Sequence, residues 1–221
     1  MMTISDDIAP PLARALSARG YSELTAVQKA MLRPDLRDAD ALVSAQTGSG
    51  KTVAFGIAMA PTLLDGAERF GPAATPLALA IAPTRELAMQ LTRELEWLYA
   101  ETGASIVSCV GGMDMRAERR LLERGAHIVV GTPGRLRDHI MRGGLDMTTL
   151  RAVVLDEADE MLDLGFREDM EFILKTTPES RRTLLFSATL PQGIVKLAKQ
   201  YQQDALRVEV AATEGGHADI E

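Results

Sequence analysis

The sequence predicts an α/β fold in which a parallel β-sheet is flanked by helices on both faces. Short apolar runs alternate with longer stretches of helical pattern, which is the arrangement of repeated strand–helix units. The apolar runs are residues 41–44, 77–82, 105–110, 127–131, 151–155 and 182–187. The chain has 221 residues, of which 46% are hydrophobic and 25% charged, so it can bury the core of one such domain.

Two helices are expected before the first strand. Residues 6–19 carry apolar side chains at helical spacing, and Gly20 provides a stop. Thr25 is a suitable N-cap for a second helix that reaches Leu32.

The helix after the strand at 77–82 has the clearest pattern, running from Thr84 to about Glu101. Residues 65–76 are rich in Gly, Ala and Pro and are expected to form a surface loop. We expect one domain over residues 1–210. The tail, residues 211–221, contains two adjacent glycines and predicts the start of a linker.

Charge and composition restrict the class of protein. A net charge of −7 and a pI near 5.1 argue against a large basic surface, so a nucleic-acid contact would rely on a few arginines, backbone amides and helix N-termini. No apolar run approaches the roughly 20 residues of a membrane helix, and no signal peptide is recognisable. We expect a cytoplasmic protein without a membrane partner. Cys109 has apolar neighbours and is expected to be a buried thiol.

A glycine-rich loop follows the first apolar run and precedes a helical stretch. Its residues are Ala45, Gln46, Thr47, Gly48, Ser49, Gly50, Lys51 and Thr52. In this context glycines let backbone N–H groups surround phosphates, Lys51 reaches the β and γ phosphates, and the Thr52 hydroxyl binds Mg²⁺. The loop therefore predicts a nucleoside-triphosphate site of the P-loop type, with Ala45 where the strict pattern has Gly.

An acidic cluster follows the apolar run at 151–155. In a parallel sheet the carboxyl ends of the strands share one edge, so this cluster and the P-loop are expected to meet. Asp156 would supply a ligand to Mg²⁺, and Glu157 would orient or deprotonate the attacking water. The alternative is a solvated helix start, where carboxylates are favoured in any case. That alternative does not explain why the cluster ends an apolar strand downstream of a P-loop.

With these motifs in place, the chain resembles the N-terminal RecA-like domain of DEAD-box RNA helicases over nearly its whole length. Residues 156–159 read Asp-Glu-Ala-Asp. The other matching segments, in the family's order, are Pro83-Thr84-Arg85-Glu86-Leu87-Ala88, Gly111-Gly112, Thr132-Pro133-Gly134-Arg135 and Ser187-Ala188-Thr189. The resemblance implies a three-layer RecA-like fold, ATP as the nucleotide, and the catalytic residues Lys51, Asp156, Glu157, Ser187 and Thr189.

Three of these segments are, by resemblance, contacts to the sugar-phosphate backbone of RNA. They are Pro83, Thr84 and Arg85; Gly111 and Gly112; and Thr132, Pro133, Gly134 and Arg135. Two of the segments present hydroxyls, amides and an arginine at a helix N-terminus, which suits phosphate. The alternative is that they are simple helix caps.

Two further segments are expected near the nucleotide. Ser187 and Thr189 should lie near Asp159, and by resemblance this contact couples hydrolysis to strand separation; an ordinary Ser/Thr turn is the alternative. Residues 20–28 resemble the family's adenine-reading motif, which implies that Gln28 reads the adenine edge by donating to one atom and accepting from another. The family usually stacks an aromatic residue on the adenine, but residues 1–20 contain none, so Tyr21 is the substitute candidate.

Other polar residues are assigned ordinary roles. His127 and His139 have no pair of potential ligands near them in sequence at metal spacing, so both are expected to be structural. Arg116, Arg119 and Arg120 form a small basic face after Gly111-Gly112, for which solvation is favoured over RNA binding.

The sequence therefore favours an ATP-dependent RNA helicase, represented by its first RecA-like domain. The resemblance implies ATP and Mg²⁺ as cofactors, RNA as a partner, a monomer, and a second RecA-like domain that supplies arginines to the ATP site. After Thr189 only 32 residues remain, too few for that second domain. We expect slow hydrolysis by this chain alone. The alternatives are a DNA helicase of the same superfamily and a non-catalytic, nucleotide-gated clamp for RNA or protein.

Overall fold

A computed structural model of the chain describes residues 6–211. Its centre is a seven-stranded sheet in the order β3-β4-β2-β5-β6-β1-β7, and every neighbouring pair of strands is parallel. The strands are β1 (Ala41–Ser44), β2 (Ala78–Ile81), β3 (Ile106–Cys109), β4 (Ile128–Gly131), β5 (Ala152–Leu155), β6 (Arg182–Ser187) and β7 (Leu206–Glu209).

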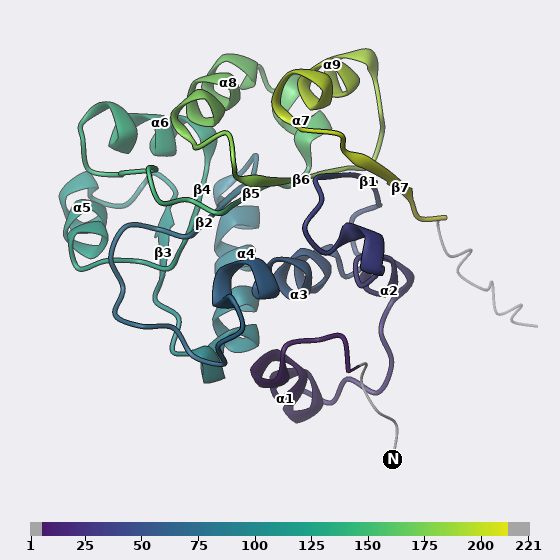
Figure 1. Cartoon of the computed structure of the whole chain (residues 1–221). Coiled ribbons are helices and arrows are strands. Elements are labelled where there is room, and N and C mark those ends of the chain that lie inside the picture. Colours follow the sequence, from purple (N-terminus) through teal and green to yellow (C-terminus); the bar gives the residue numbers. More distant parts are fainter. Residues whose placement is uncertain (1–5, 212–221) are drawn as a thin grey trace, which may run out of the picture.

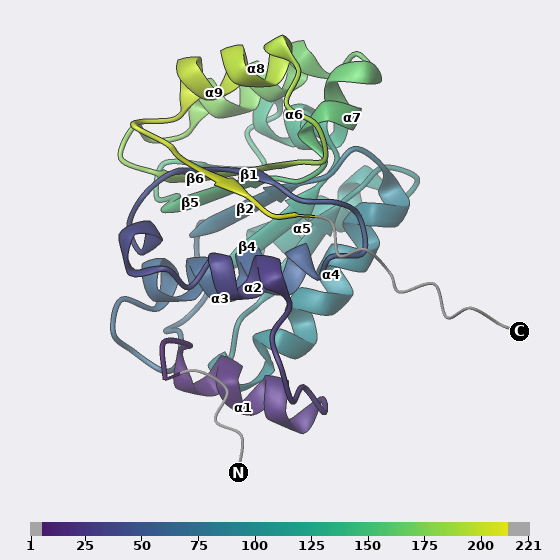
Figure 2. The ribbon, with the colours of Figure 1, turned by 90° about the vertical axis from the view of Figure 1, so that its right-hand side faces the viewer.

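Helices cover both faces of the sheet (Figure 1, Figure 2). On one face lie α1 (Pro10–Ala18), α2 (Ala26–Ala30), α3 (Lys51–Leu64) and α4 (Arg85–Leu98). On the other lie α6 (Pro133–Met141), α7 (Ala158–Asp163), α8 (Arg167–Thr176) and α9 (Gln192–Tyr201). The helix α5 (Met115–Glu123) lies at the β3 edge, and two short 3₁₀ turns are Pro34–Leu36 and Ala100–Thr102.

Alternating strand residues build two cores, one on each face. In β1, Ala41 and Val43 join the core beneath α3 and α4, whereas Leu42 joins the core beneath α6 to α9. In β2, Leu79 and Ile81 belong to the second core and are fully buried. This alternation follows from the period of two along a strand. The predicted three-layer α/β fold is confirmed.

The seventh strand was not predicted. β7 pairs with β1 at the sheet edge, and Val208 is its only buried residue. An edge strand that buries only one of its four residues has no continuous apolar run, so the criterion that finds the central strands misses it.

Helix ends differ from the expected ones for local reasons. α1 begins at Pro10 and not at Asp6, because proline disfavours helical backbone in the residue before it and Ala9 is extended, with ψ 131°. α4 begins after its N-cap Thr84 and ends at Leu98; a 3₁₀ turn continues to Thr102.

The loop at 65–76 is confirmed as a loop and is anchored to its surroundings. The Phe70 ring stacks on His127 at 4.6 Å, and His127 Nε2 lies 2.9 Å from the Gly71 carbonyl oxygen. Apart from Ala211, the predicted linker lies outside the described residues. Among residues 6–211 no helix combines the length and the apolar character needed to cross a bilayer.

Candidate functional site

The order of the strands divides the predicted site residues into two groups. Because all strands are parallel, their carboxyl ends lie along one edge of the sheet. The neighbours β5, β6 and β1 lead into the acidic cluster, Ser187-Ala188-Thr189 and the P-loop. The neighbours β3, β4 and β2 lead into Gly111-Gly112, residues 132–135 and residues 83–85. The predicted nucleotide residues thus share one half of the edge, and the predicted RNA residues share the other.

The P-loop has the backbone that its glycines allow. Gly48 and Gly50 have φ of +82° and +80°, which side-chain-bearing residues rarely adopt. Gly50 also lies tightly against Gln28, since a Cβ at position 50 would stand 2.6 Å from Gln28 Nε2. Ala45 is buried and donates its N–H to the Ser187 carbonyl at 3.1 Å. Its contact is therefore with β6, where an alanine methyl group is accommodated.

Lys51 joins the P-loop to the acidic cluster. Its Nζ lies 3.0 Å from Asp156 Oδ1 and 3.2 Å from Glu157 Oε1. The Thr47 hydroxyl also donates to Glu157 Oε1, at 3.2 Å. Lys51 is 6% exposed, so these pairs lie in a region of low dielectric. A phosphate entering the loop could take over the Lys51 contact.

Asp156 is fully buried and only half paired. Its Oδ1 accepts from Lys51 and from the Glu157 N–H at 3.0 Å, whereas Oδ2 has no hydrogen-bond partner among the described residues. Burial raises the pKa of the Asp156 carboxyl, and the nearby Lys51 opposes this shift. A buried carboxylate oxygen that lacks a partner is a suitable ligand for Mg²⁺ or for a water bound to it. Thr52, in the first turn of α3, is also buried.

Glu157 stands in a strained backbone conformation. Its φ and ψ are both 50°, in the left-handed region that few residues other than glycine adopt. This conformation ends β5 sharply and brings the Glu157 carboxylate to Thr47 and Lys51. Burial acts to raise the pKa of Glu157, but its hydrogen bond with Glu160 and the charge of Lys51 outweigh burial, so the pKa is lowered.

Asp159 is bound to the segment that follows β6. Asp159 Oδ2 accepts from the Thr189 hydroxyl at 2.9 Å and from the Thr189 N–H at 3.1 Å. Burial opposes the shift, but these hydrogen bonds outweigh it and lower the pKa of Asp159. Both residues lie near Asp159, as expected, since the Ser187 side chain contributes to the same lowering of its pKa. The Ser187 hydroxyl donates to the Thr189 carbonyl at 2.6 Å and so fixes the turn.

Gln28 is buried and already hydrogen-bonded. Its Oε1 accepts the Thr25 N–H at 2.9 Å, and its Nε2 donates to the Gly50 carbonyl at 3.1 Å. With Thr25 it forms a capping box at the start of α2. The Thr-x-x-Gln spacing signals this arrangement, but sequence reasoning considered only Thr25 as a cap. Reading an adenine edge would require Gln28 to use its remaining N–H or to exchange one of these bonds.

A pocket of about 570 Å³ lies beside Gln28 and the P-loop. Its lining includes Leu24, Thr25, Gln46 and Gly48. Tyr21 is not part of that lining. Its ring packs against Trp97, at 5.9 Å between centroids. The structure thus brings Leu24, and not Tyr21, to the pocket where a base could bind.

The Gly111-Gly112 turn lies between the two predicted RNA-contacting arginines. A Cβ at Gly112 would stand 2.3 Å from Arg85 Nη1, and one at Gly111 would stand 3.6 Å from Arg135 Nη2. Both glycines have positive φ. Segments that are far apart in the sequence therefore form one continuous surface, with Arg85 exposed and Arg135 partly exposed.

The two helix starts on this surface differ. The Thr84 side chain accepts the Leu87 N–H at 3.2 Å and so caps α4. The Thr132 side chain makes no cap hydrogen bond to α6, whose second residue, Gly134, is exposed. The helix-cap interpretation thus describes Thr84 but not Thr132, whose hydroxyl is not used by its own helix.

The remaining candidates have structural surroundings. Cys109 is fully buried, and burial raises the pKa of its thiol to about 12. The His127 ring accepts the Ser105 N–H at 2.8 Å. His139 bonds to Glu118, and together with Cys109 these side chains lie within 4.8 Å of one another. The sequence reasoning about His139 did not find this cluster, because its members are distant in sequence.

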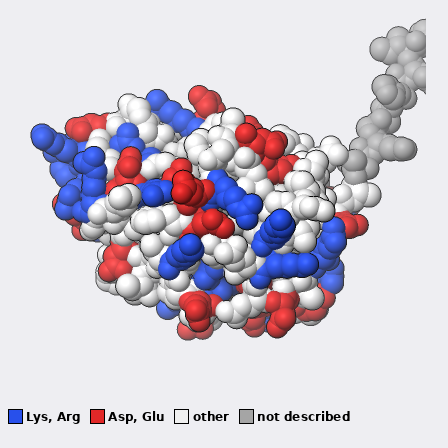
Figure 3. All heavy atoms as spheres, turned by 90° about the horizontal axis from the view of Figure 1, so that it is seen from above, with Lys and Arg blue, Asp and Glu red and all other residues white. Residues whose placement is uncertain are grey.

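The arginines of α5 lie on the surface. Arg116, Arg119 and Arg120 are exposed, and Arg119 pairs with Glu123 one turn later at 3.2 Å. Lys and Arg side chains gather at the left end of the molecule in Figure 3, where α5 lies, whereas both signs are interspersed over the rest of that face.

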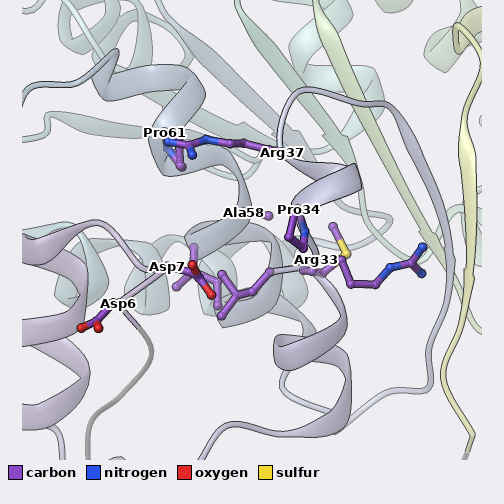
Figure 4. Close-up of a pocket in the computed structure, with 10 residues that line it drawn as sticks. Asp6, Asp7, Arg33, Pro34, Arg37, Ala58 and Pro61 are labelled. Atoms are coloured by element: carbon purple, nitrogen blue, oxygen red, sulfur yellow. The ribbon is translucent and has the colours of Figure 1, made fainter.

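Another pocket, of about 450 Å³, lies at the end of α3 remote from the P-loop (Figure 4). Arg33 and Arg37 approach it from the turn after α2, Ala58 and Pro61 line it from α3, and Asp7 belongs to the segment before α1. It contains none of the predicted site residues.

Comparisons with known proteins agree with this geometry. Residues 25–197 match the DEAD/DEAH box helicase family. The chain is 41% identical over 208 residues to the DEAD-box ATP-dependent RNA helicase CshA of Bacillus licheniformis, covering 94% of this chain and 41% of the relative. It is 40% identical over 208 residues to DEAD-box ATP-dependent RNA helicase 53 of rice (Oryza sativa), covering 94% of this chain and 34% of the relative.

A solved structure of a DEAD box protein from Methanococcus jannaschii superimposes with a TM-score of 0.84 at 34% identity, covering 95% of this chain and 56% of that one. The chain thus spans roughly a third to two fifths of the length of the two relatives, 34% and 41%. The family match covers most of the chain and includes the P-loop, the acidic cluster and the segment after β6. This chain belongs to the DEAD/DEAH box helicase family.

Proposed function

We propose that this chain is the ATP- and RNA-binding first domain of an ATP-dependent RNA helicase, which separates or remodels RNA duplexes. The observation that carries the proposal is the division of one sheet edge into two groups of polar residues. One group, after β1, β5 and β6, has the chemistry of a nucleotide site; the other, after β2, β3 and β4, presents Arg85 and Arg135 around a glycine turn. The relatives named above are ATP-dependent RNA helicases.

The nucleotide half would act chiefly by positioning and by charge. Lys51 would exchange its carboxylate partners for the β and γ phosphates, and Gly48, Gly50 and the start of α3 would surround them with N–H groups. Thr52 and Asp156 would hold Mg²⁺, which neutralises phosphate charge. Glu157 would orient the attacking water. Support comes from the unpartnered Asp156 Oδ2 and from the Lys51 and Thr47 contacts to Glu157.

The contact between Asp159 and Thr189 would couple ATP hydrolysis to strand separation. It joins the helix that begins in the acidic cluster to the segment after β6, so a shift of Glu157 or Asp156 would move it. Ser187 would fix the turn that carries Thr189.

The RNA half would follow the sugar-phosphate backbone. Arg85 and Arg135 offer guanidinium groups to phosphates, the Gly111-Gly112 turn lets the strand approach closely, and the Thr132 hydroxyl is not used by α6. Such contacts carry no base specificity.

We further propose that residues 1–210 form this domain, that residues 211–221 begin a linker, and that a second RecA-like domain completes the ATP site with arginines. Both relatives are considerably longer than this chain. Monomeric action in the cytoplasm, where ATP and RNA are both available, completes the proposal. A DNA helicase and a non-catalytic clamp are disfavoured, because the relatives are named as ATP-dependent RNA helicases.

Duplex separation by the full-length protein tests this function. A fluorescent RNA duplex with a single-stranded overhang should separate when ATP and Mg²⁺ are both present, and should remain paired without either. Equal stimulation of ATP hydrolysis by DNA and RNA would favour the DNA helicase instead. Binding of RNA with no ATP hydrolysis would favour the clamp.

A further inference from the structure

A carboxylate without any solvent exposure lies beneath the RNA half of the site. Glu118, on α5, is 0% exposed, although it carries a charge that is costly to bury without partners. We propose that Glu118 is a positioning residue, which fixes Arg135 and the Gly111-Gly112 turn in the arrangement that binds the RNA backbone. This inference rests on the proposed function.

Three donors from two other elements converge on Glu118. The N–H of Val110, the residue that follows β3, donates to Oε2 at 3.0 Å. Arg135 Nη1 and His139 Nε2, both from α6, lie 3.3 Å and 2.8 Å from Oε1. A carboxylate can only accept, so the imidazole donates its Nε2–H. One side chain of α5 thereby joins the end of β3 to α6.

Two of these partners, Val110 and Arg135, connect Glu118 to the predicted RNA contacts. Val110 is the residue before Gly111, so its N–H fixes the entry to the glycine turn. Arg135 also points its second nitrogen, Nη2, at the Met113 carbonyl at 3.4 Å, beyond the other end of the turn. The guanidinium therefore spans from Glu118 to the chain that leaves Gly112, and its orientation is fixed at both ends.

The benefit of Glu118 is geometrical. Its negative charge reduces the attraction of Arg135 for a phosphate, so removing it would strengthen binding if charge alone mattered. A guanidinium binds phosphate through a planar fork, however, and a free arginine loses side-chain entropy when it is held in one orientation. Because Glu118 already holds the Arg135 guanidinium, RNA binding removes less of its side-chain entropy.

The same cluster contains potential metal ligands, since atoms of Cys109, Glu118 and His139 lie within 4.8 Å of one another. Three observations favour the ion pair over a metal. The guanidinium of Arg135 would repel a cation at Glu118, the His139 nitrogen is directed at the carboxylate, and the thiol is protonated because burial raises its pKa to about 12.

A double-mutant cycle on residues 1–221 tests the inference. The probe is a fluorescein-labelled oligouridylate at low ionic strength, with fluorescence anisotropy as the readout. We expect Arg135→Ala and Glu118→Ala each to weaken RNA binding about tenfold. The double variant should be about threefold weaker than Arg135→Ala, well short of the tenfold that additivity gives, because Glu118 acts largely through Arg135 and otherwise through the Val110 N–H. The affinity for fluorescent ATP should stay unchanged.

Fully additive weakening, or wild-type affinity in Glu118→Ala, would overturn the positioning role. If wild-type protein binds ATP but no RNA, the proposed function fails and not merely the role of Glu118. Stoichiometric Zn²⁺ binding that His139→Ala abolishes would overturn the ion-pair assignment.

One measurement uses the unaltered chain and therefore does not depend on the folding of a variant. In the unaltered chain, restricted rotation of the Arg135 guanidinium should give Nη proton signals resolved from those of the exposed arginines by NMR. An Arg135 signal averaged with the exposed arginines would contradict the inference. Circular dichroism and the unfolding temperature identify any variant whose loss of binding reflects loss of fold.

Discussion

The guanidinium of Arg85 occupies the space that a side chain at Gly112 would need: a Cβ there would stand 2.3 Å from Arg85 Nη1. Gly112 also has φ of +71°. Two residues 27 positions apart thus fit together because one has no side chain, and this fit places an arginine beside the glycine turn of the predicted RNA surface.

Gly112→Ala should therefore weaken RNA binding. The new methyl group displaces Arg85, and the positive φ costs an L-residue about 1–2 kcal/mol. We expect about three- to tenfold lower affinity for oligouridylate with unchanged affinity for ATP. The matched control is Gly143→Ala, which has a similar positive φ of +73° but where a Cβ meets nothing within 4 Å. Equal losses in both variants would contradict the role of Arg85.

Replacing Asp156 should separate stability from function. Asp156→Asn removes a fully buried carboxylate, while Lys51 keeps its contact to Glu157 at 3.2 Å. We expect the free energy of unfolding at pH 7 to rise by about 1 kcal/mol and ATP hydrolysis to be lost. Chemical denaturation of both proteins measures the difference. A clear loss of stability would show that the Asp156–Lys51 pair stabilises the fold.

The pH dependence of that difference follows from the raised pKa of Asp156. Above this pKa the buried, ionised carboxyl destabilises the folded state. This destabilisation disappears once the carboxyl is protonated in both the folded and the unfolded state. The stability gap between Asp156→Asn and wild type should therefore narrow as the pH falls toward about 3.9, the unfolded-state pKa of aspartate.

Asp146→Asn should change the stability in the opposite direction from Asp156→Asn. Hydrogen bonds from the Thr148 side chain and N–H lower the pKa of this exposed carboxyl. Its contribution is present at neutral pH and is lost as the pH falls through the lowered pKa. The Asp146→Asn variant should be less stable than wild type at pH 7 and match it in acid.

Glu157→Gln should separate ATP binding from hydrolysis. The amide keeps the shape of the side chain but no longer acts as a base, an effect worth about 100-fold or more. In the full-length protein we expect the ATP affinity to stay within about threefold of wild type and the rate of hydrolysis to fall by about 100-fold or more. Asp163→Asn, at the end of the helix α7 whose N-cap residue is Glu157, removes the same charge and should leave hydrolysis unchanged. Full activity of Glu157→Gln in a steady-state assay would remove Glu157 from the mechanism.

Thr189→Val should uncouple hydrolysis from strand separation. The variant loses the 2.9 Å hydrogen bond to Asp159 but keeps the volume of the side chain. We expect duplex separation by the full-length protein to fall about tenfold while ATP hydrolysis changes by less than about threefold. Thr189→Ser keeps a hydroxyl and should resemble wild type. Parallel loss of both activities in Thr189→Val would place Thr189 in hydrolysis itself.

The central strands, the P-loop and the acidic cluster could be predicted from the sequence because each is a local pattern. The edge strand β7 could not, since only Val208 among its residues is buried. The arrangement of Arg85, Arg135 and the glycine turn depends on strand order, which no local pattern gives. Gln28 and Tyr21 were assigned to the nucleotide by resemblance; their hydrogen bonds and ring contacts in this chain became visible only in three dimensions.

The burial of Glu118 could not be predicted from the sequence either. In sequence it belongs to a charged, strongly amphipathic helix, where a glutamate is expected to face solvent. Its burial results from the approach of Val110, Arg135 and His139, which come from other parts of the chain. Pairings of this kind require the tertiary structure.

We propose that residues 1–221 form one half of an ATP site that a second domain completes. The most direct test is steady-state ATP hydrolysis by this chain alone, with and without oligouridylate at saturating concentration. We expect slow turnover that RNA does not stimulate, although both ligands bind. RNA-stimulated turnover of about 1 s⁻¹ or faster, as in a complete enzyme, would contradict the claim.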